Sequence, residues 1–238
     1  MLKIAGFQKT TLIDYPNHIA SIIFLSGCNF KCPFCHNPDL VLHKNIKLID
    51  GKEVLRDLEK RKNFIDGIVI TGGEPLLYSY KDLSKFIKKI KEIDSKFLIK
   101  IDTNGTNPKL LEKLIKNKLI NFVAMDIKNT KKKYNETART RVNIVNIEES
   151  IKIINKNTKN KKIDSEFRIT VLPEFHNQED LIKIGQWLKG SKKLVLQKFI
   201  PKNTLNKSFE KKPSYSEKEL KEFAKPLKLF FHRVDVRG

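Results

Sequence analysis

Three cysteines stand within eight residues of one another and are the only cysteines in the chain: Cys28, Cys32 and Cys35. Their spacing is C-x3-C-x2-C, and they follow directly after the apolar run 19–25, which predicts a buried strand. The carboxyl end of such a strand is where parallel α/β folds place their sites. An odd number of clustered thiols does not suit a disulfide framework, so we expect these thiols to bind metal.

Two metal centres fit three thiolates on one tight loop. Three thiolates can hold three irons of a [4Fe–4S] cluster and leave the fourth iron open, whereas a closed electron-transfer cluster would normally want a fourth ligand, and the chain has no fourth cysteine. A structural zinc ion would also want four ligands, and His36 could be the fourth. The spacing by itself leaves both centres open.

Polar segments also end three later predicted strands. In the first, Gly72 and Gly73 let the backbone approach a ligand closely, and Glu74 adds an acceptor for a cationic group. In the last, alternation along the strand sends Asp126 and Lys128 to one side, where a charged pair needs partners. The segments are Thr71-Gly72-Gly73-Glu74-Pro75, Ile101-Asp102-Thr103-Asn104-Gly105 and Met125-Asp126-Ile127-Lys128.

One further charged residue, Arg168, lies on the later run FRITVLP, which also predicts a strand. Its guanidinium could pair with a carboxylate of the same site. No Ser-His-Asp or paired-carboxylate constellation accompanies these segments.

Short β-rich runs alternate with amphipathic stretches along the chain, and this alternation predicts βαβ units with a parallel sheet. The periodicity is clearest in 80–93, where Leu83, Phe86, Ile87 and Ile90 predict one buried helical face. Strands are predicted over 19–25, 67–71, 97–101, 121–127, 166–172, 193–199 and 228–236, and helices near 51–62, 80–93, 108–117, 147–157 and 178–189.

About six such units indicate an α/β fold, either a partial barrel or an open doubly wound sheet. No linker divides the chain, so we expect a single domain over residues 1–238. The polar, basic stretch 129–146 predicts a loop with an irregular helix start, and the similar stretch 202–216 is expected to be exposed. Either could be a mobile segment that docks a partner, although passive loops are favoured. Trp187 lies on a helical apolar face and is expected in the core.

The composition is strongly basic, with 48 Lys and Arg against 27 Asp and Glu and a net charge of +21. The excess is mostly lysine spread along the chain, which favours a solvated surface over a nucleic-acid-binding face. No apolar stretch approaches the roughly 18–20 residues of a membrane span, and the first residues lack a signal-peptide pattern. We therefore expect a soluble, cytoplasmic protein.

The cysteine motif, with Phe34 just before the third cysteine, resembles the signature of the radical S-adenosylmethionine (SAM) superfamily. The resemblance implies a partial (β/α)6 TIM-like barrel and a [4Fe–4S] cluster held by Cys28, Cys32 and Cys35. In that family SAM binds the open iron, and an electron from the cluster cleaves its sulfonium to release a 5′-deoxyadenosyl radical. The implied activity is that of a radical SAM oxidoreductase, with no catalytic residue beyond the cluster and SAM.

Each polar segment also resembles a SAM-contacting motif of that family. The first is similar to the GGEP motif, whose backbone contacts the SAM amino group, and the second to a D-T-N-G segment that faces SAM at the barrel mouth. The third resembles the D-x-K of glycyl-radical activating enzymes, which holds the methionine moiety. The resemblance thus implies cofactor binding by Gly72, Gly73, Glu74, Asp102, Thr103, Asn104, Asp126 and Lys128, with Arg168 as a weaker case.

Longer phrases narrow the resemblance to one subgroup. T-L-I-D-Y-P near the start, C-H-N-P after the cluster motif, and R-I-T-V-L-P look like activating proteins of anaerobic ribonucleoside-triphosphate reductase. This subgroup implies generation of a glycyl radical on the reductase, with flavodoxin or ferredoxin as electron donor. A basic rim around the cluster would speed the encounter with an acidic flavodoxin.

Three positions depart from the family pattern. Asn17 and Glu174 stand where glycine is more usual, and Gln197 is the nearest polar residue where related activators place a histidine near the SAM ribose. Other functions also fit: action on another glycyl-radical enzyme, on a small molecule or on a tRNA base, as in 7-carboxy-7-deazaguanine synthases. A non-enzymatic alternative is a basic zinc-binding module that contacts nucleic acid.

Overall fold

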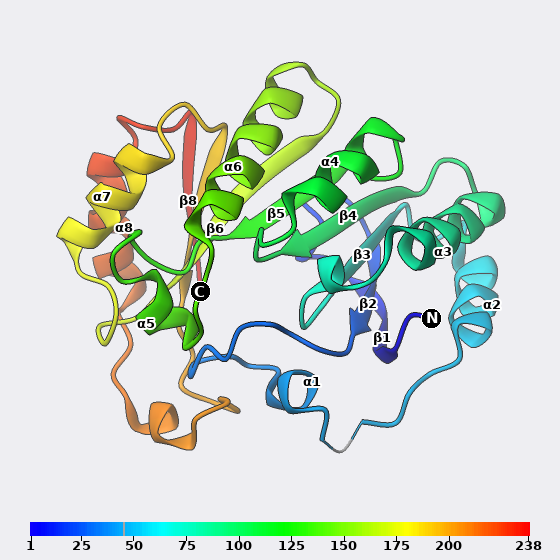
Figure 1. Ribbon diagram of the computed structural model, residues 1–238, viewed down its shortest axis with the longest axis horizontal. Helices are drawn as coiled ribbons and strands as arrows, with labels where there is room; N and C mark the ends of the chain where they lie inside the picture. Colours follow the sequence, from blue (N-terminus) through cyan, green and yellow to red (C-terminus); the bar gives the residue numbers. More distant parts are fainter. Residues whose placement is uncertain (45) are drawn as a thin grey trace.

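The computed structural model describes residues 1–44 and 46–238 and is built on one curved sheet (Figure 1). The strands stand side by side in chain order from β1 to β8. The pairs from β2 to β8 are parallel, and β1 pairs with β2 in the antiparallel sense. The strands are β1 (Ile4–Thr11), β2 (Ala20–Leu25), β3 (Gly67–Gly72), β4 (Leu98–Thr103), β5 (Phe122–Asp126), β6 (Asp164–Val171), β7 (Lys193–Lys198) and β8 (Arg233–Arg237).

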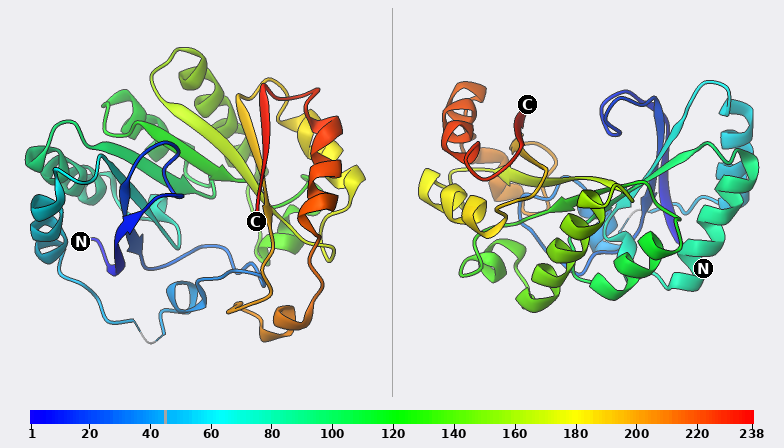
Figure 2. Two further views of the ribbon diagram at one scale, coloured as in Figure 1. Left: turned by 180° about the vertical axis from the view of Figure 1, so that it is seen from behind. Right: turned by 90° about the horizontal axis from the view of Figure 1, so that it is seen from above.

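Helices connect the parallel strands and lie along the outer side of the sheet, whose two ends turn toward the same side (Figure 2). They are α1 (Pro38–Leu42), α2 (Gly51–Arg61), α3 (Tyr80–Ile93), α4 (Pro108–Lys116), α5 (Tyr134–Ala138), α6 (Ile144–Lys159), α7 (Gln178–Trp187) and α8 (Glu217–Leu227), with 3-10 turns at Pro75–Leu77 and Lys207–Lys211. None of the helices described here combines the length and apolar character needed to cross a bilayer.

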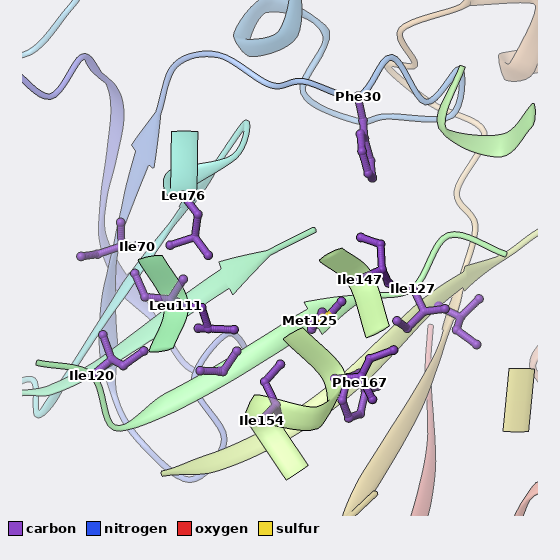
Figure 3. Packing of buried hydrophobic residues seen from close by; sticks show 14 of the residues in the cluster. Phe30, Ile70, Leu76, Leu111, Ile120, Met125, Ile127, Ile147, Ile154 and Phe167 are labelled. Carbon is purple, nitrogen blue, oxygen red and sulfur yellow. The ribbon is translucent and has the colours of Figure 1, made fainter. Parts of the chain in front are cut away.

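Alternation along the strands divides the side chains between two environments. Outward-facing residues such as Ile70, Met125 and Phe167 pack against the helices in one large apolar cluster (Figure 3). At the amino ends of the strands the inner face carries a small apolar cluster that includes Tyr15 and Phe122. Charged residues lie further along the same inner face. Because the curved sheet forms a trough around them, they must find partners within it.

The α/β partial-barrel prediction is confirmed, and the six predicted strands from 19–25 to 193–199 correspond to β2 to β7. The sequence analysis did not predict β1, an edge strand with several exposed residues. It also missed α8, although Ser216 and Glu219 form a capping box at its start. The last strand begins at Arg233 rather than at 228, because α8 ends at Leu227 and the turn that follows it occupies the intervening residues.

The stretch 202–216, predicted as an exposed loop, is largely exposed, but it is anchored to the protein at two buried positions. Thr204 is completely buried, and the Phe209 ring stacks on Phe175 with centroids 5.8 Å apart. The backbone amides of Leu205 and Asn206 donate hydrogen bonds of 2.9 Å to the carbonyls of Cys35 and Pro33, respectively. We call residues 200–212 the strap, because they are hydrogen bonded to the last part of the cysteine loop, from Pro33 to His36.

Phe209 is the apolar anchor of the strap, and its replacement tests the packing of this segment. We expect Phe209→Ala to lower the free energy of unfolding by roughly 3–5 kcal/mol, as for other buried phenylalanines. Phe64→Ala is the matched control, because Phe64 is 73% exposed and its loss should change stability by less than about 0.5 kcal/mol. Urea unfolding of both variants measures the difference, and equal effects would contradict a packed strap.

Candidate active site

A cavity of about 260 Å³ opens at the carboxyl ends of the strands. All twelve site residues proposed from the sequence line it, including the three cysteines. The sequence analysis did not select Thr170 of β6, and it named Gln197 of β7 only as a doubtful position; both also line the cavity. The complete lining is Cys28, Phe30, Cys32, Phe34, Cys35, His36, Asn37, Val41, Thr71, Gly72, Gly73, Glu74, Asp102, Thr103, Asn104, Asp126, Lys128, Arg168, Thr170 and Gln197.

The cysteine loop is held from several directions. Phe30 and Phe34, which alternate with the cysteines, are buried in the main core. The amide of Lys31 donates to the Ala138 carbonyl at 2.9 Å, and the strap binds the loop further along. Since the aromatic side chains fix the backbone between the cysteines, the thiols are presented to the cavity on a supported loop.

The three thiols form no disulfide with one another, and burial is the main influence on the pKa of each. Burial raises the pKa of Cys28 to about 11 and that of Cys32 to about 12, and it also raises the pKa of Cys35. Metal ligation requires thiolates, so a bound cation must supply the charge that offsets this burial. Over residues 1–44 and 46–238, no three His, Cys, Asp or Glu side chains form a group that could hold one metal ion. A [4Fe–4S] cluster would not need such a group, because three thiolates would each ligate a different iron and leave the fourth iron open.

Gly72 and Gly73 press the end of β3 against the start of the cysteine loop. Gly72 has φ +119°, and a Cβ on Gly73 would lie 1.9 Å from the carbonyl oxygen of Gly27. The amide of Glu74 donates to that same carbonyl at 2.7 Å. The glycines are therefore required for a close backbone approach to the chain's own cysteine loop, whatever they also offer to a ligand.

Glu74 is almost completely buried and binds the neighbouring D-T-N-G segment. Its carboxylate accepts from the Thr103 hydroxyl at 2.7 Å, the Asn104 amide at 2.6 Å and the Leu76 amide at 2.9 Å. Burial raises the pKa of Glu74 to about 7, against the effect of these three hydrogen bonds. Both oxygens are thus already engaged by the protein, so the geometry suits Glu74 to position Thr103 and Asn104.

Arg168 lies at the centre of an inward-facing group of charges. Its Nε donates to Asp126 at 2.8 Å, and its Nη1 donates to Asp102 at 3.1 Å. Lys100, a buried residue that the sequence analysis did not select, pairs with Asp102. Burial disfavours the ionised carboxylates, but these cations outweigh it and lower the pKa of both Asp102 and Asp126. Three neighbouring strands thus carry a balanced set of charges toward the cavity.

Lys128 extends this charge group toward the cysteines. Its ammonium lies 3.0 Å from Asp126, and the charge of Asp126 raises its pKa although burial opposes this. The buried His176 holds the Lys128 backbone, because its Nε2 lies 2.8 Å from the Lys128 carbonyl oxygen. Burial lowers the pKa of His176 to about 4, which keeps the imidazole neutral near pH 7. A neutral ring can donate from Nε2 to the carbonyl.

The three departures noted in the sequence have local structural accounts. Asn17 has φ +65°, a left-handed conformation that asparagine tolerates better than most residues other than glycine. Glu174 pairs with Lys212 at the end of the strap, at 2.8 Å. Gln197 faces the cavity. The loop after β6 is thus connected to the segment that binds the cysteine loop.

Comparisons with known proteins agree with this geometry. Residues 22–188 match the sequence model of the Radical SAM superfamily. A Methanocaldococcus jannaschii protein named "Putative glycyl-radical enzyme activating enzyme" is 36% identical over 98% of this chain and 95% of its own length. A pyruvate formate-lyase-activating enzyme from Streptococcus mutans is 26% identical over 85% of this chain and 80% of its own length.

Solved structures show the same fold at low sequence identity. A domain of a pyruvate formate-lyase-activating enzyme from Bacteroides vulgatus aligns with a TM-score of 0.54 and 13% identity, over 72% of this chain and 99% of that domain. The structure of anSMEcpe with bound AdoMet and a peptide aligns with a TM-score of 0.53 and 20% identity, over 72% of this chain. The aligned part is 48% of that longer protein.

Removal of Arg168 tests the central charge group. In Arg168→Met, two inward-facing carboxylates lose their shared partner, and we expect the free energy of unfolding at pH 7 to fall by about 3 kcal/mol. The exposed Arg56→Met is the matched control and should have little effect. Urea unfolding measures both. Adding Asp102→Asn and Asp126→Asn to Arg168→Met should restore part of the loss, and no recovery would argue against uncompensated charge as its cause.

The raised pKa of Glu74 predicts a pH dependence of stability. Between the ordinary value of 4.5 and the folded value of about 7, the folded chain holds a proton on Glu74 that the unfolded chain releases. The stabilisation by this proton is complete below pH 4.5 and is lost as the pH rises to about 7. Relative to Glu74→Gln, the wild type should therefore lose about 3 kcal/mol of unfolding free energy across this window.

Chemical denaturation of both proteins at a series of pH values measures that difference. A surface variant, Glu149→Gln, controls for loss of a carboxylate in an exposed position. A stability difference between wild type and Glu74→Gln that stays constant from pH 4.5 to 7 would refute the raised pKa.

Proposed function

This chain belongs to the radical SAM superfamily, and we propose that it activates anaerobic ribonucleoside-triphosphate reductase by generating a glycyl radical on it. Enzymes of this superfamily use a [4Fe–4S] cluster and SAM, and the match covers residues 22–188. The observation that carries the proposal is the single cavity in which the three thiols and all of the predicted SAM-binding residues meet. We propose that residues 1–238 act as one domain in this reaction.

In this proposal Cys28, Cys32 and Cys35 each ligate one iron of the cluster. Their thiolates are soft donors of the kind that iron–sulfur clusters take. Three ligands leave one iron open for SAM. The zinc-binding alternative is set aside, since the superfamily assignment carries an iron–sulfur cofactor.

The other cavity residues bind and orient SAM. Lys128 offers an ammonium for the SAM carboxylate, and the backbone at Gly72 and Gly73 is available to the SAM amino group. Asp102, Thr103, Asn104, Asp126 and Arg168 line the same cavity, and the Arg168 group holds its two carboxylates ionised and in place. Glu74 positions Thr103 and Asn104 by accepting hydrogen bonds from the Thr103 hydroxyl and the Asn104 amide.

When bound, the reduced cluster supplies one electron to SAM, and the resulting radical chemistry removes a hydrogen atom from a Cα of the partner. This reaction needs no general acid or base from the protein, which fits a site in which Asp102 and Asp126 are paired with cations. The contribution of this chain is to bind, orient and shield the cofactors.

The nature of the partner rests on the relatives and on short sequence phrases. The 36% identical relative extends over nearly the whole chain and is named as a glycyl-radical enzyme activating enzyme, which supports a glycyl-radical enzyme as the partner. The phrases T-L-I-D-Y-P and C-H-N-P favour the ribonucleotide reductase. Relatives named pyruvate formate-lyase-activating enzymes make pyruvate formate-lyase the second target to test.

The electron donor in this proposal is flavodoxin or ferredoxin. The net charge of +21 favours an acidic redox protein as the partner, because opposite charges accelerate the encounter at low salt. The rate of reduction by such a donor is expected to fall as the ionic strength rises.

Electron paramagnetic resonance tests the proposal directly. An anaerobic mixture of the reconstituted protein, SAM, a strong reductant and the reductase from the same source should give a glycyl doublet on the reductase that is absent without SAM. Cys32→Ala removes one proposed iron ligand and should abolish both the doublet and the formation of 5′-deoxyadenosine.

The same experiment separates the alternatives. Formation of 5′-deoxyadenosine without a doublet would reject the reductase as target, and pyruvate formate-lyase then replaces it in the mixture. If Cys32→Ala retained a full complement of iron and sulfide and still cleaved SAM, the assignment of the cluster ligands would be wrong.

A further inference from the structure

The strand β8 forms one end of the sheet, and its outer edge pairs with no other strand of the described chain. The amide of Arg233 donates to the carbonyl of Lys192, next to β7, at 3.1 Å. In a parallel pair, alternate residues turn both backbone groups toward the neighbouring strand, so those of Val234 and Val236 point to the free edge. An edge of this kind is a template on which an extended peptide can pair.

A groove of about 570 Å³ lies between β8 and α8, the helix beside it (Figure 2). Its lining is Lys221, Ala224, Lys225, Lys228, Arg233, Val234, Asp235, Val236 and Arg237. On the helix side, the small Ala224 leaves room between three exposed lysines. The groove therefore offers main-chain pairing along the strand and positive charge along the helix.

The charge of the groove determines which kind of strand it suits. Lys221 and Lys225 contact glutamates of the same helix at 2.6 Å, but such exposed pairs are weak. The carboxylate that lines the groove, Asp235, is already paired with Lys193 at 3.0 Å and with Arg233 at 2.7 Å. A second copy of this chain would bring the same positive charges against the edge and is disfavoured, whereas an acidic strand would be attracted.

The free edge also leads toward the candidate active site. Arg237, at the end of β8, is in register with Gln197 of β7, which lines the cavity. A strand paired outside β8 would lie about 10 Å from Gln197, because neighbouring strands are about 4.8 Å apart. About three extended residues span that distance. A segment held on this edge would therefore bring a residue a few positions further along into reach of the cavity.

We propose that an extended, acidic segment of the glycyl-radical partner pairs with the free edge of β8 and lies in this groove. The inference rests on the proposed function, in which the partner must present a glycine to the cavity. The backbone groups of Val234 and Val236 bond to the main chain of the segment, and the lysines of α8 bind its carboxylates. The edge thereby sets the direction from which the target glycine approaches.

Val234→Pro tests the strand pairing, because proline removes an outward-facing amide and its ring blocks another strand, while the ladder to β7 is kept. Val234→Ala is the matched control, since it loses the same apolar packing and keeps the amide. With dithionite as the reductant, Val234→Pro should raise the reductase concentration needed for half-maximal glycyl-radical formation roughly tenfold, and Val234→Ala should not. Formation of 5′-deoxyadenosine from SAM without the reductase should be equal in both variants.

Charge reversal tests the groove without altering the strand. The double variant Lys225→Glu and Lys228→Glu should also weaken activation of the reductase, and the loss should be larger at low than at high ionic strength. Lys88→Glu with Lys89→Glu is the matched control, because both lysines are exposed on α3 and the net charge changes by the same amount. This control should activate the reductase like the wild type.

Hydrogen exchange locates the contact directly, since binding of the reductase should slow exchange of the Val234 and Val236 amides. Unchanged exchange of these amides, or activation by Val234→Pro and the charge-reversed groove at the wild-type level, would overturn the inference while leaving radical generation intact. Self-association that Val234→Pro abolishes would overturn it by assigning the edge to a second copy of the chain. Absence of a glycyl doublet with the wild type, on both the reductase and pyruvate formate-lyase, would instead overturn the proposed function, and this inference with it.

Discussion

The charge group around Arg168 is the interaction on which the interior of this protein depends. Helices cover one face of the sheet, so alternation along β4, β5 and β6 sends apolar residues outward and charged residues into the trough. Asp102 and Asp126 are acceptable there because Arg168 bridges them across three strands. Unpaired, either carboxylate would be costly to bury and would take up a proton.

A second pairing group closes the far edge of the trough. Arg237 of β8 makes a bidentate contact with the buried Glu166, at 2.9 and 2.7 Å, and Lys193 lies between Glu166 and Asp235 at 3.2 and 3.0 Å. The last strand is therefore attached by charge on its inner side and by apolar packing on its outer side. Such buried pairs add little net stability, since desolvation offsets much of the attraction.

The cysteine loop depends on segments that are far apart in the chain. Its start packs against Gly73 of β3, and its middle is hydrogen bonded to α5. Asn104 binds Asn29 from the D-T-N-G segment at 2.7 Å, and the strap binds the carbonyls of Pro33 and Cys35. Each of these segments also carries or supports a residue that lines the cavity. The geometry of the proposed cluster site and that of the proposed SAM site are consequently set by the same contacts, which suits a reaction in which the two cofactors would meet.

The sequence by itself determined the α/β class, the six central strands and all twelve residues proposed for the site. It could do so because parallel strands bring their carboxyl ends to one edge, so that polar segments following successive strands must meet. Only the tertiary structure decided the rest. The role of Glu74 depends on the distant Thr103 and Asn104, the burial of Asp102 depends on Arg168 two strands away, and the position of the strap depends on Cys35 and Phe175. These contacts join residues that are separated in the chain, and local periodicity carries no information about such partners.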